Sequence, residues 1–232
     1  MIQLQKTVYS IYLSTLLMAT THHAWAVEDS FESYNRSIES LNEGVDQTIV
    51  KPVTQGYIDL IPDPMRQAGK NIVNNLQEPV TILNDLLQGK ISQGIQDTAR
   101  LIFNSTFGIF GFIDIATPMG LPKHDEDFGQ TFAVWGWKDS SYFNLPLFGP
   151  STVRDALGKP LSIVMTNFGI PFTTVRILST REALMPLDPM LEASPDRYVF
   201  IRDGYLQQRD YLIYDGQPTV QKNPLKDFDF SD

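Results

Sequence analysis

Few side chains in this sequence are of the types that carry bond-making chemistry. His124 is the only histidine beyond residue 26, and no cysteine occurs in the 232 residues. A serine hydrolase would have to combine His124 with a serine such as Ser105, but Ser105 lacks the G-x-S-x-G turn that exposes a nucleophile. His124 lies among acids, a composition typical of a solvated loop. We therefore predict that the chain is not an enzyme, with a Ser105-dependent lipid hydrolase as the alternative.

The acidic run Asp125-Glu126-Asp127 offers oxygen ligands for a hard cation. Three consecutive acids do not converge on one ion without the glycine-turned loop of a calcium site. Acids also favour the N-terminus of a helix, so we interpret the run as a helix cap. The segment 88–92 (QGKIS) lacks the upstream glycine and the Lys-Ser/Thr pair of a phosphate-binding loop. We expect neither a metal nor a cofactor.

The elements that must position any site are predicted to be short amphipathic helices punctuated by Pro and Gly. One apolar stripe recurs at steps of three and four and predicts a first helix that ends before Pro52. Its members are Tyr34, Ile38, Leu41, Val45 and Ile49. Similar spacing predicts helices near 53–60, 64–77, 79–88 and 91–102, within 161–185 with a break at Pro171, and over 194–216.

Residues 118–160 differ from these helices because they are rich in Gly, Pro and aromatic side chains. A short helix is expected after Asp127, and 142–147 is expected to be a strand or an extended segment. The fold class that follows is all-α: a set of short amphipathic helices with a Gly/Pro/aromatic-rich insert that has room for a small extended or hairpin element.

Residues 103–116 (FNSTFGIFGFIDIA) pose a separate question, because seven of the fourteen side chains are large and apolar. Burying each is worth roughly 1.5–3 kcal/mol, so the stretch is expected to leave water. As a helix it would be about 21 Å long, short of the ~30 Å hydrocarbon core of a bilayer. The sequence alone leaves two destinations open, a protein core or part of a lipid layer.

Composition and the two ends of the chain set further limits. Residues 1–26 carry an early lysine, an apolar run and a final Ala-Trp-Ala, the pattern of a cleaved secretory signal peptide. We expect one domain over 27–216 and a disordered acidic tail over 217–232. The net charge of −9 argues against nucleic-acid binding, which needs Lys and Arg, and requires any contact with anionic lipid to rest on apolar insertion.

Several short segments follow one another in a characteristic order over residues 30 to about 215. They are Tyr34-Asn35-Arg36, Pro79 with 86–90 (LLQGK), 100–106 (RLIFNST), Gly108, 111–116 (GFIDIA), 127–131 (DFGQT), 145–151 (LPLFGPS), Arg154-Asp155 and 198–210. Together their order and spacing resemble the MlaA (VacJ) family, an outer-membrane component of Gram-negative phospholipid transport. No single segment is decisive.

The resemblance implies a helical ring in the inner leaflet of the outer membrane, on its periplasmic side, with an amphipathic channel. Such proteins are taken to remove misplaced phospholipids from the outer leaflet and to pass them to the periplasmic carrier MlaC, beside trimeric porins. Members are normally lipidated at a cysteine after the signal peptide, and this sequence has no cysteine, so we expect membrane attachment without it. The alternative is a soluble periplasmic lipid-binding module.

Twelve residues are candidates for the lipid pathway or for the family motifs. For Asp114, Arg154 and Asp155 two roles stay open, contact with lipid, or capping and pairing with one another. The candidates are Asn104, Ser105, Thr106, Gly108, Gly111, Asp114, Phe128, Gly129, Pro146, Gly149, Arg154 and Asp155.

Overall fold

The computed structural model of this protein describes residues 29–166 and 168–216. The predicted signal peptide (1–26) and acidic tail (217–232) lie outside the described residues. Within the described part the chain is mainly helical and has no β-strand, which confirms the all-α prediction. In chain order the elements are α2 (Glu32–Val45), the π-helical turn η1 (Asp46–Val50), α3 (Lys51–Leu60), α4 (Asp63–Gln88), α5 (Ile91–Thr106), α6 (Phe128–Val134), α7 (Val153–Met165), α8 (Ile170–Leu184), the 3-10 turn η2 (Met185–Leu187), α9 (Asp188–Ala193) and α10 (Arg197–Ile213).

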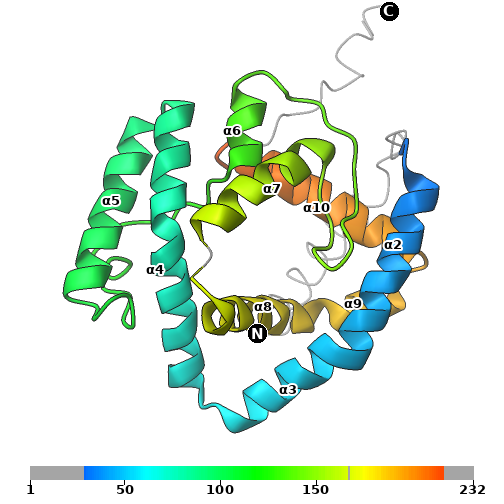
Figure 1. Ribbon diagram of the computed structural model, residues 1–232, viewed down its shortest axis with the longest axis horizontal. Coiled ribbons are helices and arrows are strands. Elements are labelled where there is room, and N and C mark those ends of the chain that lie inside the picture. Colours follow the sequence, from blue (N-terminus) through cyan, green and yellow to red (C-terminus); the bar gives the residue numbers. More distant parts are fainter. Residues whose placement is uncertain (1–28, 167, 217–232) are drawn as a thin grey trace, which may run out of the picture. The chain divides into compact units, whose positions relative to one another are not determined.

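The helices belong to one compact unit that begins at Phe31, and within it they follow one another around a ring (Figure 1). From α2 the chain runs through α3 into α4, which packs against α5, α6 and α8. Helix α6 in turn contacts α7 and α10. The circuit closes where α10 begins, because Arg36 of α2 forms an ion pair of 2.8 Å with Asp196, the N-cap of α10. The predicted ring of helices is confirmed.

Of two predicted helix boundaries at prolines, one is confirmed and one is wrong. The first helix ends before Pro52, because α2 ends at Val45, the π-helical turn η1 follows, and α3 begins at Lys51 with Pro52 in its first turn, where the missing N–H costs no hydrogen bond. Pro79 does not start a new helix but lies inside α4, which runs unbroken over 26 residues. Contacts with three neighbouring helices offset the hydrogen bond that Pro79 removes. The predicted end of α4 is confirmed, since Gly89 caps it with a left-handed φ of 77°.

In α2 and α5 the apolar stripes read from the sequence face outward, whereas in α4 Ala68, Val73 and Val80 are buried. In α2 the apolar Leu41 is exposed, whereas Asn35 and Glu39 are buried. In α5 Ile95 is 65% exposed, whereas Asp97 is fully buried. Among the described residues polar and charged side chains outnumber apolar ones at buried positions. The unit therefore has a polar interior and a largely apolar outer surface.

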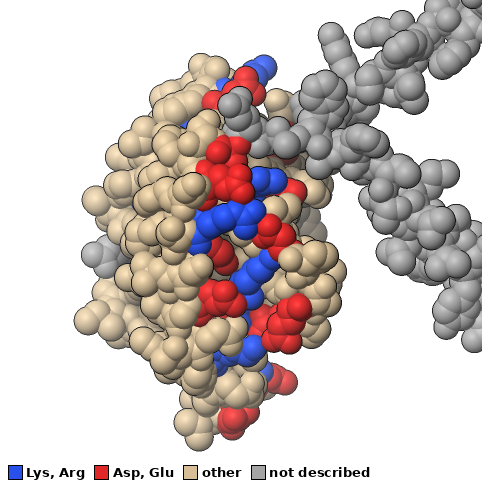
Figure 2. All heavy atoms as spheres, turned by 90° about the vertical axis from the view of Figure 1, so that its right-hand side faces the viewer, with Lys and Arg blue, Asp and Glu red and all other residues tan. Residues whose placement is uncertain are grey.

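The charged residues are gathered rather than spread over the surface. On the side of the molecule seen in Figure 2, Lys, Arg, Asp and Glu run in one band from top to bottom, with residues of other kinds on both sides. Within 29–166 and 168–216 no helix combines the length and the hydropathy that crossing a bilayer would require.

The apolar stretch after α5 is not the helix that the sequence suggested. Helix α5 ends at Thr106, and 107–113 fold into successive tight turns that leave five large apolar side chains exposed. The backbone is left-handed at Ile109, Phe110 and Gly111. Gly108 is required because a Cβ there would lie 2.1 Å from the carbonyl oxygen of Ile113. We call residues 107–113 the apolar knob.

The Gly/Pro/aromatic-rich insert contains the small extended element that was predicted. Tyr142 forms an isolated antiparallel bridge with Thr152, and Leu145 forms another with Gly149. The insert packs on α2 through Asn35, whose side-chain oxygen accepts a hydrogen bond of 2.8 Å from the Asn144 backbone. This hairpin connects α6 to α7 and fixes where α7 begins.

Candidate functional site

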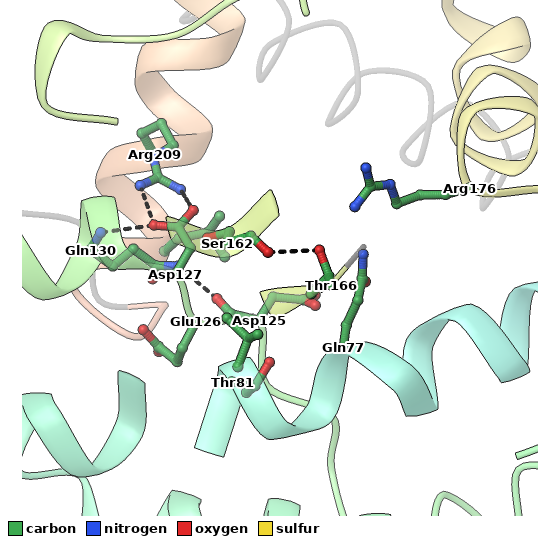
Figure 3. A pocket seen from close by; sticks show the side chains of 12 residues that line it. Gln77, Thr81, Asp125, Glu126, Asp127, Gln130, Ser162, Thr166, Arg176 and Arg209 are labelled. Atoms are coloured by element: carbon green, nitrogen blue, oxygen red, sulfur yellow. Dashed lines mark hydrogen bonds and ion pairs between the residues drawn. The ribbon is translucent and has the colours of Figure 1, made fainter. Parts of the chain in front are cut away.

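A cavity of about 220 Å³ opens within the polar interior of the unit (Figure 3). It is lined from α4, α6, α7, α8 and α10 and from the acidic run before α6. Figure 3 shows Gln77 rising from α4 and Arg176 pointing across from α8, while Arg209 and Asp127 form the opposite wall. The lining also includes the apolar Val80 and Leu212, so the cavity is amphipathic.

A buried charge network holds one wall of this cavity. Arg209 of α10 donates to Asp127 at 2.8 Å and to Asp155 of α7 at 2.9 Å. Tyr205, one turn earlier in α10, donates to the other oxygen of Asp155 at 2.8 Å. Burial works to raise the pKa of Asp155, but the charges of Arg209 and Arg154 outweigh it and hold that pKa below its ordinary value. The network fastens α6, α7 and α10 to one another.

Glycines let the two short helices of this network approach closely. A Cβ on Gly129 of α6 would lie 2.2 Å from a carboxylate oxygen of Asp155, and a Cβ on Gly158 of α7 would lie 2.8 Å from the Gly129 nitrogen. Phe128, beside Gly129, is buried. The Asp-Phe-Gly motif is thus explained by packing: Asp127 caps α6 by accepting from the Gln130 nitrogen at 2.9 Å, as predicted, and Gly129 admits α7.

Arg154 and Asp155, which left two roles open, pair with each other at 3.1 Å. Arg154 also donates to the backbone oxygens of Trp137 and Lys138, which anchors the insert on α7. The motif residues Pro146 and Gly149 lie in the turn of the insert, with Gly149 at a φ of 74°. None of these four lines the cavity of Figure 3. The hydrogen bonds and ion pairs of these residues are structural, and a direct contact with lipid stays a prediction.

Candidates at the end of α5 form a second, separate cluster that secures the apolar knob. The side-chain oxygen of Asn104 accepts from the backbone nitrogens of Ile115 and Ala116, and its amide donates to Asp114 at 3.2 Å. Asp114 lies 3.5 Å from Arg100. Although burial works to raise it, the pKa of Asp114 is lowered by hydrogen bonds from Thr117 and by the charge of Arg100. Gly111 fits against Asn75, where a Cβ would come within 2.5 Å.

The structure does not bring together the pair that a hydrolase would need. Ser105 accepts a hydrogen bond from Asn75 at 3.0 Å, and the ring of His124 lies 2.9 Å from Asp97. Thr106 bonds back to the carbonyl of Ile102 in its own helix. Among the described residues no hydrogen bond joins Ser105 to His124. Nor do the described residues contain a group of three His, Cys, Asp or Glu able to hold a metal ion.

Buried acids lie where α4 packs on α5. Asp85 and Asp97 are fully buried, and neither carboxylate oxygen of Asp85 has a hydrogen-bond partner. Burial, with the neighbouring Asp97 adding to it, raises the pKa of Asp85 to about 8. Burial likewise raises the pKa of Glu78 to about 7, although Glu78 lies 3.2 Å from Arg100. The folded chain therefore holds protons that the unfolded chain releases near pH 4.

This proton uptake predicts a stability that depends on pH. A carboxyl whose pKa is raised on folding stabilises the fold fully below its unfolded pKa, and the contribution is lost as pH rises through about 8. Asp85→Asn removes the titrating group, so we expect its melting temperature at pH 8.5 to exceed that of the unaltered chain by at least about 3 °C. The two proteins should differ less at pH 5.5. Thermal melting at both pH values checks this.

The control for Asp85→Asn is Asp139→Asn, which alters an exposed acid of the insert and should leave the melting temperature unchanged at both pH values. A pH dependence that is the same in Asp85→Asn and in the unaltered chain would contradict the assignment.

Sequence reasoning missed the residues that shape the cavity. Arg209, Arg176 and Gln77 belong to no motif that suggests chemistry. A signal was nonetheless present in α4, where the polar Lys70, Asn74, Gln77 and Thr81 recur at steps of three and four opposite the apolar positions. This polar stripe marks the face of α4 that lines the cavities, and the spacing of the apolar residues alone does not indicate it.

Fold and site together define a class of protein: a ring of helices with many apolar residues outward, polar residues inward and an amphipathic cavity. The comparisons with known proteins agree with this class. The profile of the family described as MlaA lipoprotein matches residues 27–212. The chain therefore belongs to the MlaA family.

Individual relatives cover most of the chain. The intermembrane phospholipid transport system lipoprotein MlaA of Escherichia coli (strain K12) is 33% identical over 221 residues, which is 87% of this chain and 88% of the relative. The protein of the same name from Haemophilus influenzae is 27% identical over 214 residues, 86% and 84% of the two chains. A solved structure that concerns maintenance of bacterial outer membrane lipid asymmetry matches with a TM-score of 0.70 at 28% identity, covering 80% of this chain and 99% of that chain.

Proposed function

We propose that this protein transports phospholipids between membranes and maintains the lipid asymmetry of the Gram-negative outer membrane. It removes phospholipids that have reached the outer leaflet and passes them through an amphipathic path toward the periplasm. Support comes from relatives named as components of an intermembrane phospholipid transport system, and from a similar structure concerned with outer membrane lipid asymmetry.

One observation carries the proposal, namely the reversed placement of polar and apolar residues. A chain that is soluble by itself buries its apolar side chains, whereas this unit buries Asp97 and Arg100 and exposes Ile95 and Phe110. The outer surface then rests among acyl chains. The polar interior accepts the headgroup, which could not cross the hydrocarbon layer without a large desolvation cost.

Transport of this kind is passive in the protein itself, and no bond has to break. The chain supplies a polar route with apolar walls beside it, as in the cavity lined by both Asp127 and Val80. A catalytic role is therefore not part of the proposal. The separate hydrogen bonds of Ser105 and His124 support this reading.

Position and partners follow from the same proposal. The protein lies on the periplasmic side of the outer membrane after export by its signal peptide, and it is held there by its outward apolar residues without a lipid-anchor cysteine. A periplasmic carrier, MlaC, receives the lipid, and trimeric porins flank the protein in the membrane. The carrier and the porins are what the resemblance to the MlaA family implies, and the support for them is that the chain belongs to this family.

Complementation in cells tests the proposal. We expect a bacterial strain that lacks its own MlaA-family protein to accumulate phospholipid in the outer leaflet. An added phospholipase can reach this phospholipid from outside the cell. We expect the full chain to restore a low outer-leaflet content, and we expect Ser105→Ala to restore it equally, because Ser105 only accepts a bond from Asn75. The measurement is the amount of phospholipid that the added phospholipase cleaves per cell at matched protein levels.

The alternatives give different outcomes in this experiment. Failure of Ser105→Ala at a normal protein level would favour a hydrolase. A soluble carrier is separated by fractionation: it stays in the soluble periplasm, whereas the proposed protein sediments with outer membrane and resists a carbonate wash.

A further inference from the structure

A second cavity, of about 320 Å³, lies between α4 and α8 and has a different charge character from the first. Each helix contributes one face, since the lining residues recur at steps of three and four along both. The lining residues are Lys70, Val73, Asn74, Gln77, Arg176, Ser179, Thr180, Ala183 and Leu184. No carboxylate is among them.

Lys70 and Arg176 carry positive charge that nothing in the described structure neutralises. Most Lys and Arg residues within 29–166 and 168–216 form an ion pair with a carboxylate. The exceptions are Lys70, Lys138, Lys159 and Arg176, and two of these four line this one cavity. In a chain with a net charge of −9, two unpaired cations at one cavity mark a place suited to an anion.

The first cavity shows the contrast. Its cation Arg209 is already bound by Asp127 and Asp155, so it has no charge to offer a ligand. Its acid Glu126 is likewise bound by Lys90 at 2.8 Å. Arg176 lines both cavities and forms no ion pair with a carboxylate of the described residues. Figure 3 shows its guanidinium pointing into the open space.

The α4–α8 cavity also has an unused polar group and an apolar wall. Ser179 is 9% exposed, and its hydroxyl has no hydrogen-bond partner. A buried hydroxyl without a partner destabilises the fold. After rotation of its side chain, Ser179 could donate to an acceptor oxygen of a bound ligand. Val73, Ala183 and Leu184 provide apolar contact beside the cations. The combination fits an amphiphile with an anionic group. The volume lies at the lower end of small-molecule sites, roughly 300–1,000 Å³, and suits a headgroup rather than a whole lipid.

We propose that the α4–α8 cavity binds the phosphodiester group of a phospholipid, with Arg176 and Lys70 as the two cationic contacts. Arg176 suits two phosphate oxygens at once, and Lys70 supplies a point charge. Because no carboxylate lines the cavity, an anionic headgroup such as phosphatidylglycerol binds more tightly than a zwitterionic one with its own ammonium group. This inference rests on the proposed function, and it identifies the part of the phospholipid that the α4–α8 cavity binds.

Binding measured on the purified full chain in detergent tests the inference. The probes are dihexanoylphosphatidylglycerol, dihexanoylphosphatidylethanolamine, dihexanoylglycerol, which lacks phosphate, and inorganic phosphate. We expect phosphatidylglycerol to bind at least tenfold more tightly than each of the other three. Lys70→Gln and Arg176→Gln should each weaken it about tenfold, and the double variant should bind it no better than dihexanoylglycerol.

Two further variants separate charge from structure. Lys138→Gln removes a cation that also lacks a carboxylate partner but does not line the cavity, and it should bind like the unaltered chain. Arg176→Lys keeps the charge but loses the contact with two oxygens, so its affinity should lie between those of the unaltered chain and Arg176→Gln. Because Lys70 and Arg176 make no ion pair, the glutamine variants should melt at the temperature of the unaltered chain.

Unchanged phosphatidylglycerol affinity in the double variant overturns the inference, even if the chain restores asymmetry in cells. Inorganic phosphate that binds as tightly as the lipid overturns the assignment to a lipid source. Charge-dependent binding of phosphatidylglycerol by a chain that fails complementation would instead support the site and reject the proposed function.

Discussion

Replacing Asp155 by alanine is expected to destabilise the protein by about 3–5 kcal/mol, since it removes one partner from a buried ion network. Its carboxylate binds Arg209 at 2.9 Å, Arg154 at 3.1 Å and the Tyr205 hydroxyl at 2.8 Å. Without this carboxylate, Arg209, Arg154 and Tyr205 would each keep a donor group that has lost its acceptor. Thermal melting should show a drop of roughly 10 °C for a domain of this size.

Asp203→Ala is the matched control for that result. It removes an acid of α10 that pairs with Arg202 at 2.8 Å but is 37% exposed, and such pairs contribute at most about 1 kcal/mol. If Asp155→Ala melted within a few degrees of Asp203→Ala, the network would not be what fastens α6, α7 and α10.

Replacing Phe110 by aspartate is expected to weaken binding to lipid vesicles about a hundredfold. Phe110 is 79% exposed at the tip of the apolar knob. A carboxylate in hydrocarbon costs about 2.5–3.5 kcal/mol, and 1.4 kcal/mol corresponds to a factor of ten. The backbone at Phe110 is left-handed, with a φ of 56°, a conformation that aspartate tolerates better than phenylalanine, so the fold should not suffer. Co-sedimentation with vesicles gives the partition constant.

Phe110→Leu keeps an apolar side chain at the same place and should lower vesicle binding only slightly. Equal binding by Phe110→Asp and Phe110→Leu would mean that the knob stays outside the lipid, and the role given to residues 107–113 would fail.

The sequence indicates which faces of the helices are apolar. It does not indicate whether those faces lie in the interior of the protein or on its surface. The stripe that includes Leu41 and Ile49 was predicted correctly, and both residues are exposed. Periodicity reports only that one face differs from the other. Whether the apolar face turns to a core or to lipid depends on what the polar face can bind, and for Asn35 the partner lies more than a hundred residues away in the insert.

The positions at which helices end were also difficult to predict from the sequence. Pro79 was interpreted as a helix boundary, but packing around α4 overrides its local preference. In the apolar knob the opposite occurred, because Gly108 and Gly111 break a stretch that apolar composition made look helical. The cap predicted before α6 is confirmed, since the Asp127 side chain accepts a hydrogen bond from the Gln130 nitrogen in the first turn of that helix.

Contacts between distant residues were beyond the sequence altogether. Arg209 and Asp155 are 54 residues apart, and no spacing rule connects them. Lys70 and Arg176 become notable only because α4 and α8 pack together and leave both cations without acids. The family segments included both Arg154-Asp155 and 198–210, but Arg209 was not named as a site candidate, although it carries the network to the cavity wall.

The absence of cysteine makes one direct measurement possible, because single cysteines can be introduced and labelled with a fluorophore. Labels at Ile95 and Phe110, in the protein reconstituted into vesicles, should be quenched by lipids that carry bromine on their acyl chains and protected from aqueous iodide. A label at the exposed acid Glu32 should show the reverse. Iodide quenching at Ile95 and Phe110 as strong as at Glu32 would contradict the account, because the outward apolar residues would then face water.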